Sequence, residues 1–345
     1  MNHAINHRIV VPERGGPEVL QLVEEPMPEP AAGEARVKVL ASGVSAYDPM
    51  MRSMYFPGFP KPPFTPGEDF VGVVDAIGSG VTALSPGDTV ACGTFMGGGG
   101  GGYAEYICRP VDELVPVPNG LDPAVAVCLI VNYLTAHTMM HRVAKAQSGE
   151  RVLIQGAAGG TGSALLDLGR LAGLEMYGTA SPHHHDFVSG FGATPIDYRT
   201  EDVPARIREL TGDGVDVAFD AIGGFRQLWR SYRTLRKGGR LVWFGVANVS
   251  RYGVRTIPLS LLARTFLALL PDGKSAPLTP TPKKDDPVDL AWYRDTLAEF
   301  FDLTAAGKLN PVVADRIPLR DAARAQEMIG HGGYVGKLVL VNQPG

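Results

Sequence analysis

The sequence predicts a two-domain α/β protein, in which a small β-barrel or β-sandwich accompanies a doubly wound parallel sheet. The chain has 345 residues, more than one hydrophobic core usually serves. Its first third contains short β-branched runs bounded by glycine. In its middle, apolar strand-like runs alternate with helical patterns, an order that is typical of parallel βαβ units.

The predicted barrel or sandwich rests on several short strands near the N-terminus. Residues Ala35 to Val44 and Asp69 to Val81 are rich in β-branched side chains and are interrupted by glycine. Residues Ser85 to Gly93 add a Pro-Gly-Asp turn that leads into another strand. The six glycines Gly97 to Gly102 are interpreted as a plain loop in preference to a close approach of the backbone to a ligand.

The parallel sheet is predicted from the middle of the chain. The strand "RVLIQ" leads through glycines into a helix at Thr161 to Gly173, whose apolar residues recur with helical spacing. The segments "LEMYGTA", "GATPIDY", "GVDVAFDAIGG" and "GGRLVWFGVAN" read as further strands. Candidate helices lie between them at Val203 to Thr211 and Phe225 to Leu235.

The last part of the sequence has a mixed pattern. Residues Pro271 to Pro287 are rich in proline and charge, so we expect a mobile loop and not a packed element. Residues Trp292 to Gly307 form an amphipathic pattern that predicts a helix stopped by glycine. The segment "DAARAQEMIGHGG" predicts a second helix, and "GKLVLV" predicts a closing strand.

Composition excludes several classes of partner. The formal net charge of −4, from 32 basic and 36 acidic side chains, does not favour nucleic acid or an anionic membrane. Cys92, Cys108 and Cys128 are odd in number and lack C-x-x-C spacing, so neither disulfides nor a structural zinc is expected. The N-terminus does not read as a signal peptide, and "LLARTFLALL" is too short to span a bilayer. A cytoplasmic location is expected.

The glycine turn after "RVLIQ" is the most informative motif. The dinucleotide fingerprint G-x-G-x-x-G here reads from Ala157 to Gly162, with alanine at the first glycine position. Gly159 allows the backbone to approach a pyrophosphate, and Gly162 allows the helix to pack close to the strand. The free N–H groups at the start of the helix then hold phosphate oxygens.

The residues after the second strand favour NADPH over NADH. An enzyme that prefers NAD places a carboxylate about twenty residues after the fingerprint, on the ribose 2′-hydroxyl. Here no Asp or Glu occurs between Gly178 and His185, whereas Ser181 and the imidazoles can donate to a 2′-phosphate. The run His183, His184 and His185 is poorly arranged to chelate one ion, because adjacent side chains point in different directions, and which ring faces the phosphate stays open.

Together these segments resemble a known family. The segments "PGEDFVGVVDAIGSGVTALSPGDTV", "GGYAEY", "LIVNYLTAHTMM", "VLIQGAAGGTG", "PIDY", "FDAIGG" and "YVGKLVLV" are similar to the medium-chain dehydrogenase/reductase superfamily. The branch they resemble is that of the zinc-free quinone oxidoreductases and, within it, the vesicle amine transport protein group.

The resemblance implies a fold and an assembly. It implies a GroES-like β-barrel catalytic domain at residues 1–124 and 265–345, and a Rossmann NADP-binding domain at residues 125–264. It also implies an active site in the cleft between the domains. A homodimer that joins the Rossmann sheets edge to edge is expected as well.

The resemblance also bears on metal. Zinc relatives carry a cysteine near Ser45 and a His-Glu pair near Glu68 and Asp69; this chain has a serine in place of the cysteine, and two carboxylates with no histidine in place of the pair. Because a catalytic zinc needs three suitable protein ligands, we expect no metal. Without a Lewis acid, the favoured reaction is hydride transfer from NADPH to an acceptor that is already electrophilic, a quinone or an α,β-unsaturated carbonyl (enone).

The resemblance assigns a set of cofactor contacts. Gly159, Gly160 and Thr161 should hold the pyrophosphate, and Asn132 and Thr135 should lie near the nicotinamide. The predicted contacts of the 2′-phosphate are Ser181, His184 and Tyr198. Gly223 and the segment Phe244 to Val246 should pass beneath the nicotinamide, and Lys337 should close over the cofactor.

The proton donor is less well defined by the resemblance. Relatives often have tyrosines where this chain has Met50 and Phe56. Tyr47 is the favoured substitute, with Tyr55, Ser45, Asp48 and solvent as alternatives. Two rival functions stay open: a stand-alone enoyl reductase of a biosynthetic pathway, and a low-turnover NADPH-binding protein that acts through partners.

Overall fold

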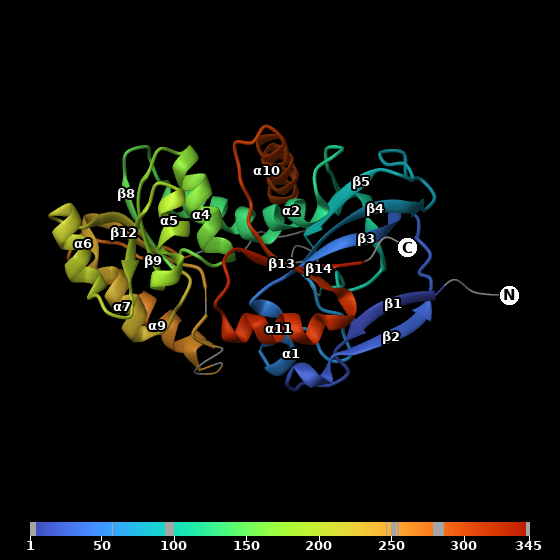
Figure 1. The fold of residues 1–345 in the computed structure, drawn as a ribbon, viewed down its shortest axis with the longest axis horizontal. Helices are drawn as coiled ribbons and strands as arrows, with labels where there is room; N and C mark the ends of the chain where they lie inside the picture. The colour runs from blue at the N-terminus through green and yellow to red at the C-terminus, as the bar shows by residue number, and fades with distance from the viewer. Residues whose placement is uncertain are drawn as a thin grey trace. The chain divides into compact units, whose positions relative to one another are not determined.

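The structure is a computed structural model that describes residues 5–56, 58–93, 100–245, 247–249, 253, 255–278 and 286–342. The chain divides into two compact units (Figure 1). The antiparallel unit comprises Met1–Leu134, Pro282–Gly333 and Lys337–Gly345, and the parallel unit comprises Thr135–Thr281 and Tyr334–Gly336. These divisions fall later in the chain than the expected boundaries at residues 124 and 265.

The parallel unit contains the predicted doubly wound sheet. Within the described residues its five strands run parallel in the order β10-β9-β8-β11-β12. The strands are β8 (Arg151–Gln155), β9 (Glu175–Ala180), β10 (Thr194–Asp197), β11 (Val215–Asp220) and β12 (Leu235–Trp243). The helices are η5 (Thr138–Ala144), α4 (Gly160–Leu171), η6 (Pro182–His184), α5 (His185–Gly190), α6 (Val203–Thr211), α7 (Phe225–Arg233) and α9 (Thr256–Ala268).

The segment after α9 corrects one expectation. Ser275 pairs in parallel with Arg240 of β12, and the Leu241 N–H donates to the Ser275 carbonyl over 2.8 Å. Ala276 is 2% exposed and belongs to the core. The expectation of an unpacked loop is therefore wrong for residues 273–276, because their backbone satisfies the open edge of β12. Residues 279–285 lie outside the described part of the chain.

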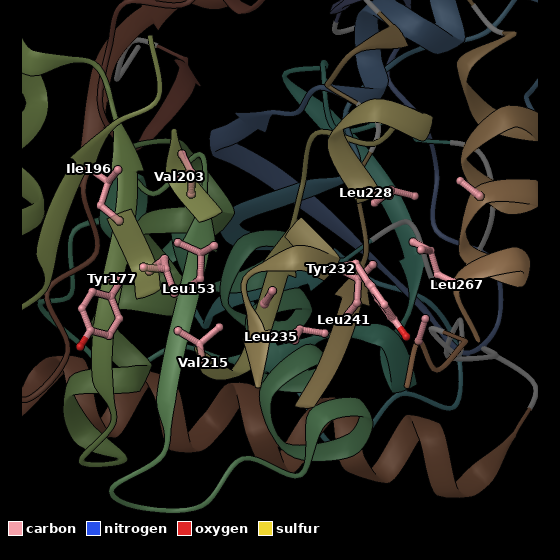
Figure 2. Close-up of a cluster of buried hydrophobic side chains, with 14 residues drawn as sticks. Leu153, Tyr177, Ile196, Val203, Val215, Leu228, Tyr232, Leu235, Leu241 and Leu267 are labelled. Atoms are coloured by element: carbon pink, nitrogen blue, oxygen red, sulfur yellow. The ribbon is translucent and has the colours of Figure 1, made fainter. Parts of the chain in front are cut away.

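The core of the parallel unit packs helices against the sheet through apolar side chains (Figure 2). Leu153, Ile196 and Val215 lie in β8, β10 and β11. Leu228 and Leu267 come from α7 and α9. Burying each such side chain stabilises the fold by about 1.5–3 kcal/mol. This core holds the carboxyl ends of the strands in place, and those ends carry the glycine turns.

The antiparallel unit is built on a longer sheet. Among the described residues the strand order is β13-β14-β3-β4-β5-β7, with β6 also paired to β3 and a separate hairpin β1-β2. The strands are β1 (Ile5–Val10), β2 (Gln21–Pro26), β3 (Glu34–Val44), β4 (Asp69–Ile77), β5 (Thr89–Gly93), β6 (Tyr106–Pro110), β7 (Val115–Pro116), β13 (Val313–Pro318) and β14 (Lys337–Val341). All pairs are antiparallel except β13 with β14.

Alternation of buried and partly exposed side chains along β3 shows why this sheet forms. Ala35, Val37 and Val39 are buried, whereas the residues between them are partly exposed, as a strand with one buried face requires. These side chains meet Phe70 and Val90 of the neighbouring strands in one apolar cluster. The helices of this unit are η1 (Pro17–Val19), α1 (Tyr47–Ser53), η3 (Val111–Glu113), α2 (Pro123–Cys128), η4 (Leu129–Tyr133), α10 (Pro287–Ala305), η7 (Leu319–Asp321) and α11 (Ala322–His331).

A continuous helical path explains where the first unit boundary falls. Asp122 caps α2 by accepting from the Ala124 N–H over 2.9 Å. The path then runs through η4, α3 (Leu134–His137) and η5 without a loop, so the division falls inside a helix. By length and composition Pro123–Ala144 is apolar enough to cross a membrane, but 72% of its most apolar window is buried in the structure. Such burial is typical of a core helix.

Candidate cofactor-binding and catalytic sites

The glycine turn joins β8 to α4 as the fingerprint requires. Gly159 is the N-cap of α4, and no side chain caps the helix. The first-turn amides of Gly160 and Thr161 therefore lack intrahelical acceptors and are available to an anion. A Cβ on Gly162 would lie 2.2 Å from the Gly156 carbonyl oxygen, so only glycine allows this close packing. The geometry fits a bound pyrophosphate.

A second segment lies against the same turn, and sequence reasoning did not place it there. The Gly336 N–H donates to the Ala158 carbonyl over 3.0 Å, and Gly336 forms a parallel bridge with Gly159. The segment Tyr334–Gly336 is thereby part of the parallel unit. The carbonyl of Ala158 is used by this contact, whereas the amides at the start of α4 are not.

The predicted phosphate contacts Ser181 and Tyr198 lie together in the parallel unit. Ser181 follows β9 and is 8% exposed, whereas Tyr198 follows β10 and is 44% exposed. Hydrogen bonding from Ser181, and next from Arg199, lowers the pKa of the Tyr198 phenol. The guanidinium carbon of Arg199 lies 5.8 Å from the centroid of the Tyr198 ring. Sequence reasoning missed Arg199, although it directly follows Tyr198 in "IDYR".

The three histidines occupy a 3₁₀ turn and the start of α5. The rings of His183 and His184 meet edge to face with centroids 4.0 Å apart. Desolvation, followed by the neighbouring His183 and Arg199, lowers the pKa of His184. The imidazole is therefore mostly neutral at pH 7, and Arg199 supplies the permanent positive charge of this group. Within the described ranges, no three His, Cys, Asp or Glu side chains are grouped so as to hold a metal ion.

Gly223 and Phe244 lie at the carboxyl ends of adjacent strands. The Gly223 N–H donates to Asp220 Oδ1 over 2.9 Å, and the Phe244 N–H donates to the Asp220 carbonyl over 3.1 Å. Gly223 has a φ of +72°, which favours glycine. Asp220 thus fixes both predicted segments at the edge of the sheet where parallel α/β folds bind ligands. Val246, the third predicted residue here, lies outside the described residues.

The two residues predicted near the nicotinamide fall on either side of the unit boundary. Asn132 lies in η4 and is 9% exposed. Thr135 lies in α3, is half-buried and opens the parallel unit. Their roles stay predictions.

Lys337 is engaged in a buried ion pair. Its Nζ lies 2.9 Å from Asp69 Oδ2, and the two side chains are 2% and 0% exposed. Burial disfavours the ammonium charge, but Asp69 outweighs it and raises the pKa of Lys337 above its usual value. A Cβ on Gly43 would lie 2.0 Å from Lys337 Cε, so glycine makes room for this pair. The predicted closure of Lys337 over the cofactor stays a prediction, and the observed partner is Asp69.

Ser45, Asp48 and Glu68 form a polar group in the antiparallel unit. Ser45 Oγ donates to Glu68 Oε2 over 2.9 Å and accepts from the Tyr47 N–H over 3.1 Å. The buried carboxylate of Asp48 accepts from the N–H groups of Ser45 and Gly67 and from the Tyr103 hydroxyl, over 2.7, 3.1 and 3.0 Å. Ser45 and Glu68, which occupy zinc-ligand positions of the zinc relatives, therefore hydrogen-bond to each other.

Burial raises the pKa values in this group. Desolvation, opposed by the backbone donors, raises the pKa of Asp48 to about 6. Desolvation, and next the charge of Asp48, raises the pKa of Glu68 to about 8. The predicted donor Tyr47 is 45% exposed, and its ring meets Phe59 edge-on at 6.2 Å. Partial desolvation, and next Glu68, raises the pKa of the Tyr47 phenol.

These features define a dinucleotide-dependent dehydrogenase or reductase, and comparison with known proteins identifies its family. Residues 31–119 match the alcohol dehydrogenase GroES-like domain, and residues 191–340 match the zinc-binding dehydrogenase domain. The chain belongs to the medium-chain dehydrogenase/reductase superfamily, in the branch that contains the quinone oxidoreductases, and it is an oxidoreductase. The predicted family and the predicted GroES-like and Rossmann-like fold are confirmed.

Its relatives are similar over nearly the whole chain. The quinone oxidoreductase of Mus musculus is 31% identical over 340 residues, which cover 95% of this chain and 96% of that protein. The human synaptic vesicle membrane protein VAT-1 homolog is 30% identical, over 96% of this chain and 85% of that protein. The solved structure of mycobacterial Rv1454c complexed with NADPH has a TM-score of 0.83 and 29% identity, over 98% of this chain and 100% of that chain.

Proposed function

We propose that this chain is an NADPH-dependent, zinc-independent reductase that transfers hydride to a quinone or to an α,β-unsaturated carbonyl. The observation that carries the proposal is the pairing of an uncapped α4 N-terminus with a separate polar group at Ser181, Tyr198 and Arg199. A dinucleotide with a 2′-phosphate presents two anionic groups. The N-terminus of α4 can bind the pyrophosphate, and the group at Ser181, Tyr198 and Arg199 can bind the 2′-phosphate.

The choice of NADPH depends on the group that follows β9 and β10. The guanidinium of Arg199 can pair with a phosphate dianion, and Ser181 and Tyr198 supply hydroxyl donors beside it. The similar mycobacterial Rv1454c was solved in complex with NADPH, which supports the same cofactor here. The bound cofactor supplies the hydride; this chain's residues bind and orient it.

The contacts of Ser45, Glu68 and Lys337 support zinc independence. Ser45 donates to Glu68, and Asp69, at the position of the family's metal-adjacent glutamate, accepts from Lys337. A cation at Lys337 Nζ takes the charge-balancing place beside Asp69, so a metal ion is not needed to neutralise it. An electrophilic acceptor suits such a site, because its oxyanion can be stabilised by hydrogen bonds alone.

The direct test measures cofactor affinity and turnover. We expect NADPH to bind more tightly than NADH in fluorescence titrations, and we expect quinones or enones to stimulate NADPH oxidation. Equal dissociation constants for the two cofactors would contradict the phosphate site. Tight NADPH binding with no oxidation across the panel would instead favour the low-turnover binding protein that acts through partners.

An enoyl reductase remains the alternative substrate assignment. One structural neighbour is the CurF ER cyclopropanase from the curacin A biosynthetic pathway, at 25% identity and a TM-score of 0.84 over 97% of this chain and 99% of that chain. Adding enoyl thioesters to the panel separates the two readings. A preference for these thioesters over quinones and simple enones would favour the alternative.

We further propose a homodimer formed through the parallel unit. Helices α7 and α9 pack side by side (Figure 1) and expose large apolar side chains. These are Phe225, Trp229, Leu259, Leu262, Phe266 and Leu269, exposed by 40–78%. A contiguous exposed apolar surface is typical of an interface. Light scattering should give a dimer mass, and a Leu262→Glu variant should lower it. A cytoplasmic location remains an expectation.

A further inference from the structure

We propose that Gln155 is a positioning residue that holds two turns of the parallel unit in one fixed arrangement: the glycine turn at residues 156–160 and the turn at Gly223. This inference rests on the proposed function, because it takes both turns as parts of the NADPH site. All the residues that carry it lie in the parallel unit.

A chain of buried hydrogen bonds starts at the glycine turn and crosses the sheet. The Gly156 N–H donates to Thr179 Oγ1 over 3.0 Å, and this hydroxyl donates to Gln155 Oε1 over 2.9 Å. Gln155 Nε2 donates to Ser231 Oγ over 3.1 Å, and Ser231 donates to Asp220 Oδ2 over 2.6 Å. The chain of hydrogen bonds therefore runs from β9 through β8 and α7 to β11.

The two ends of this chain fix its direction. The Gly156 amide can only donate, whereas the Asp220 carboxylate meets four donors and holds no proton, so it can only accept. The four donors are the N–H groups of Ile222 and Gly223, Nε2 of Gln227 and the hydroxyl of Ser231. Gln155 must therefore turn its amide oxygen to β9 and its amide nitrogen to α7.

The four side chains of the chain are too deeply buried to exchange a lost partner for water. Gln155 is 3% exposed, Thr179 is 2% exposed, and Ser231 and Asp220 are 0% exposed. A buried polar group that loses its hydrogen bond retains the cost of its desolvation. The arrangement is therefore stable only when every link is present.

Thr179 holds the start of the glycine turn. Its hydroxyl accepts from the Gly156 N–H, and its carbonyl accepts from the Ala157 N–H over 3.0 Å. These two amides lie before α4. They therefore do not compete with the amides of Gly160 and Thr161, which are available to a phosphate.

Asp220 holds the second turn at the carboxyl end of β11. Its Oδ1 accepts from the N–H groups of Ile222 and Gly223 over 2.8 and 2.9 Å. The Gly223 carbonyl accepts from Asn248 Nδ2 over 2.7 Å. The turn expected beneath the nicotinamide is thus held through both its N–H and its carbonyl groups.

Gln155 connects the two ends because its strand lies between theirs. In the sheet β8 has β9 on one side and β11 on the other, and Gln155 is its last residue. NADPH spans both turns, so its binding benefits when their separation is preset. A ligand that occupies only the glycine turn gains nothing from this separation.

The first test compares NADPH with 2′,5′-ADP, which has no nicotinamide, by calorimetric titration of the full-length protein. Gln155→Met keeps the length of the side chain but removes its donor and its acceptor. We expect the NADPH dissociation constant to rise about tenfold and that of 2′,5′-ADP to stay within about twofold. Gln147→Met, at an exposed glutamine of the same unit, is the matched control and should change neither constant.

Gln155→Glu tests the donor role of the amide nitrogen. A protonated carboxyl at this position can accept from Thr179 and donate to Ser231, whereas a carboxylate cannot donate. Burial and the negative charge of Asp220, one hydroxyl away, disfavour the carboxylate. The ratio of the variant's NADPH dissociation constant to that of the wild type should therefore rise about fivefold or more from about pH 6 to about pH 8.5. Gln147→Glu adds the same charge at the exposed position, and its ratio should not change with pH.

Four outcomes would overturn the proposal. If Gln155→Met leaves both dissociation constants unchanged, Gln155 has no positioning role. If it raises both equally, Gln155 supports the glycine turn alone. If the ratio for Gln155→Glu does not change with pH, the amide nitrogen is not the required donor; this measurement decides the matter should Gln155→Met fail to fold in circular dichroism. These three outcomes leave the reductase function standing, whereas a wild type that binds no NADPH would remove that function and this inference together.

Discussion

The guanidinium of Arg199 lies over the ring of Tyr198, with 5.8 Å between its central carbon and the ring centroid. Ser181 also lies close enough to Tyr198 to lower the pKa of its phenol, so one arginine, one phenol and one serine lie together after β9 and β10. The positive charge of this group comes from a side chain that stays protonated at every physiological pH. Two predictions follow for the cofactor.

Arg199→Ala should weaken NADPH binding selectively. Losing a charge-assisted contact to the 2′-phosphate should raise the NADPH dissociation constant about tenfold or more. The NADH dissociation constant should change little, because NADH lacks that phosphate. Fluorescence titration of both cofactors checks this. Arg320→Ala, at an exposed arginine of the antiparallel unit, is the matched control. An equal rise in the NADH dissociation constant would show that Arg199 supports the structure of the turn and does not act through the 2′-phosphate.

The affinity for NADPH should change little between pH 7 and pH 8.5. His184 has a lowered pKa, so its protonated form is already scarce at pH 7 and little charge remains to be lost as pH rises. Calorimetric titration at three pH values measures the trend. If the affinity for NADPH weakens clearly across this range and the His184→Ala variant removes this pH dependence, the imidazole of His184 contacts the phosphate.

Gly162→Ala should destabilise the protein and abolish cofactor binding. The added Cβ would lie 2.2 Å from the Gly156 carbonyl oxygen and 2.8 Å from Ala157 Cα. Both are backbone atoms, so relieving the clash requires a shift of the main chain. Forced overpacking of this kind costs about 1–3 kcal/mol or more. Thermal unfolding and NADPH titration report the two effects. Gly190→Ala, where an added Cβ meets no atom within 4 Å, should leave both quantities unchanged.

Lys337→Met should destabilise the antiparallel unit by about 3–5 kcal/mol, because it leaves the buried Asp69 carboxylate without a counter-charge. Chemical denaturation measures the loss, and Lys61→Met at an exposed lysine is the control. The double variant Lys337→Met with Asp69→Asn should recover part of the stability, since no charge is then buried. A variant of normal stability that binds NADPH poorly would instead support the predicted closure of Lys337 over the cofactor.

Local patterns in the sequence were sufficient for much of the parallel unit. The strand, glycine turn and helix at "RVLIQGAAGGTG" appear as predicted, and the helix at Val203–Thr211 has the predicted bounds. Such elements can be predicted because strand and helix periodicity and glycine conformations depend on near neighbours. The packing of residues 273–276 could not be predicted, because it depends on the open edge of β12, a partner more than thirty residues away.

By itself the sequence determined the α/β class, the glycine turn, the absence of a carboxylate after β9 and the family. The tertiary structure alone decided which side chains meet. It joined Lys337 to Asp69 across 268 positions, placed Ser45 on Glu68, and placed the guanidinium of Arg199 over the ring of Tyr198. The physical reason is that hydrogen bonds and pKa values depend on distance and burial in space, which residue order does not specify. The proposed charge partner of the 2′-phosphate is accordingly Arg199, fourteen residues beyond the three consecutive histidines.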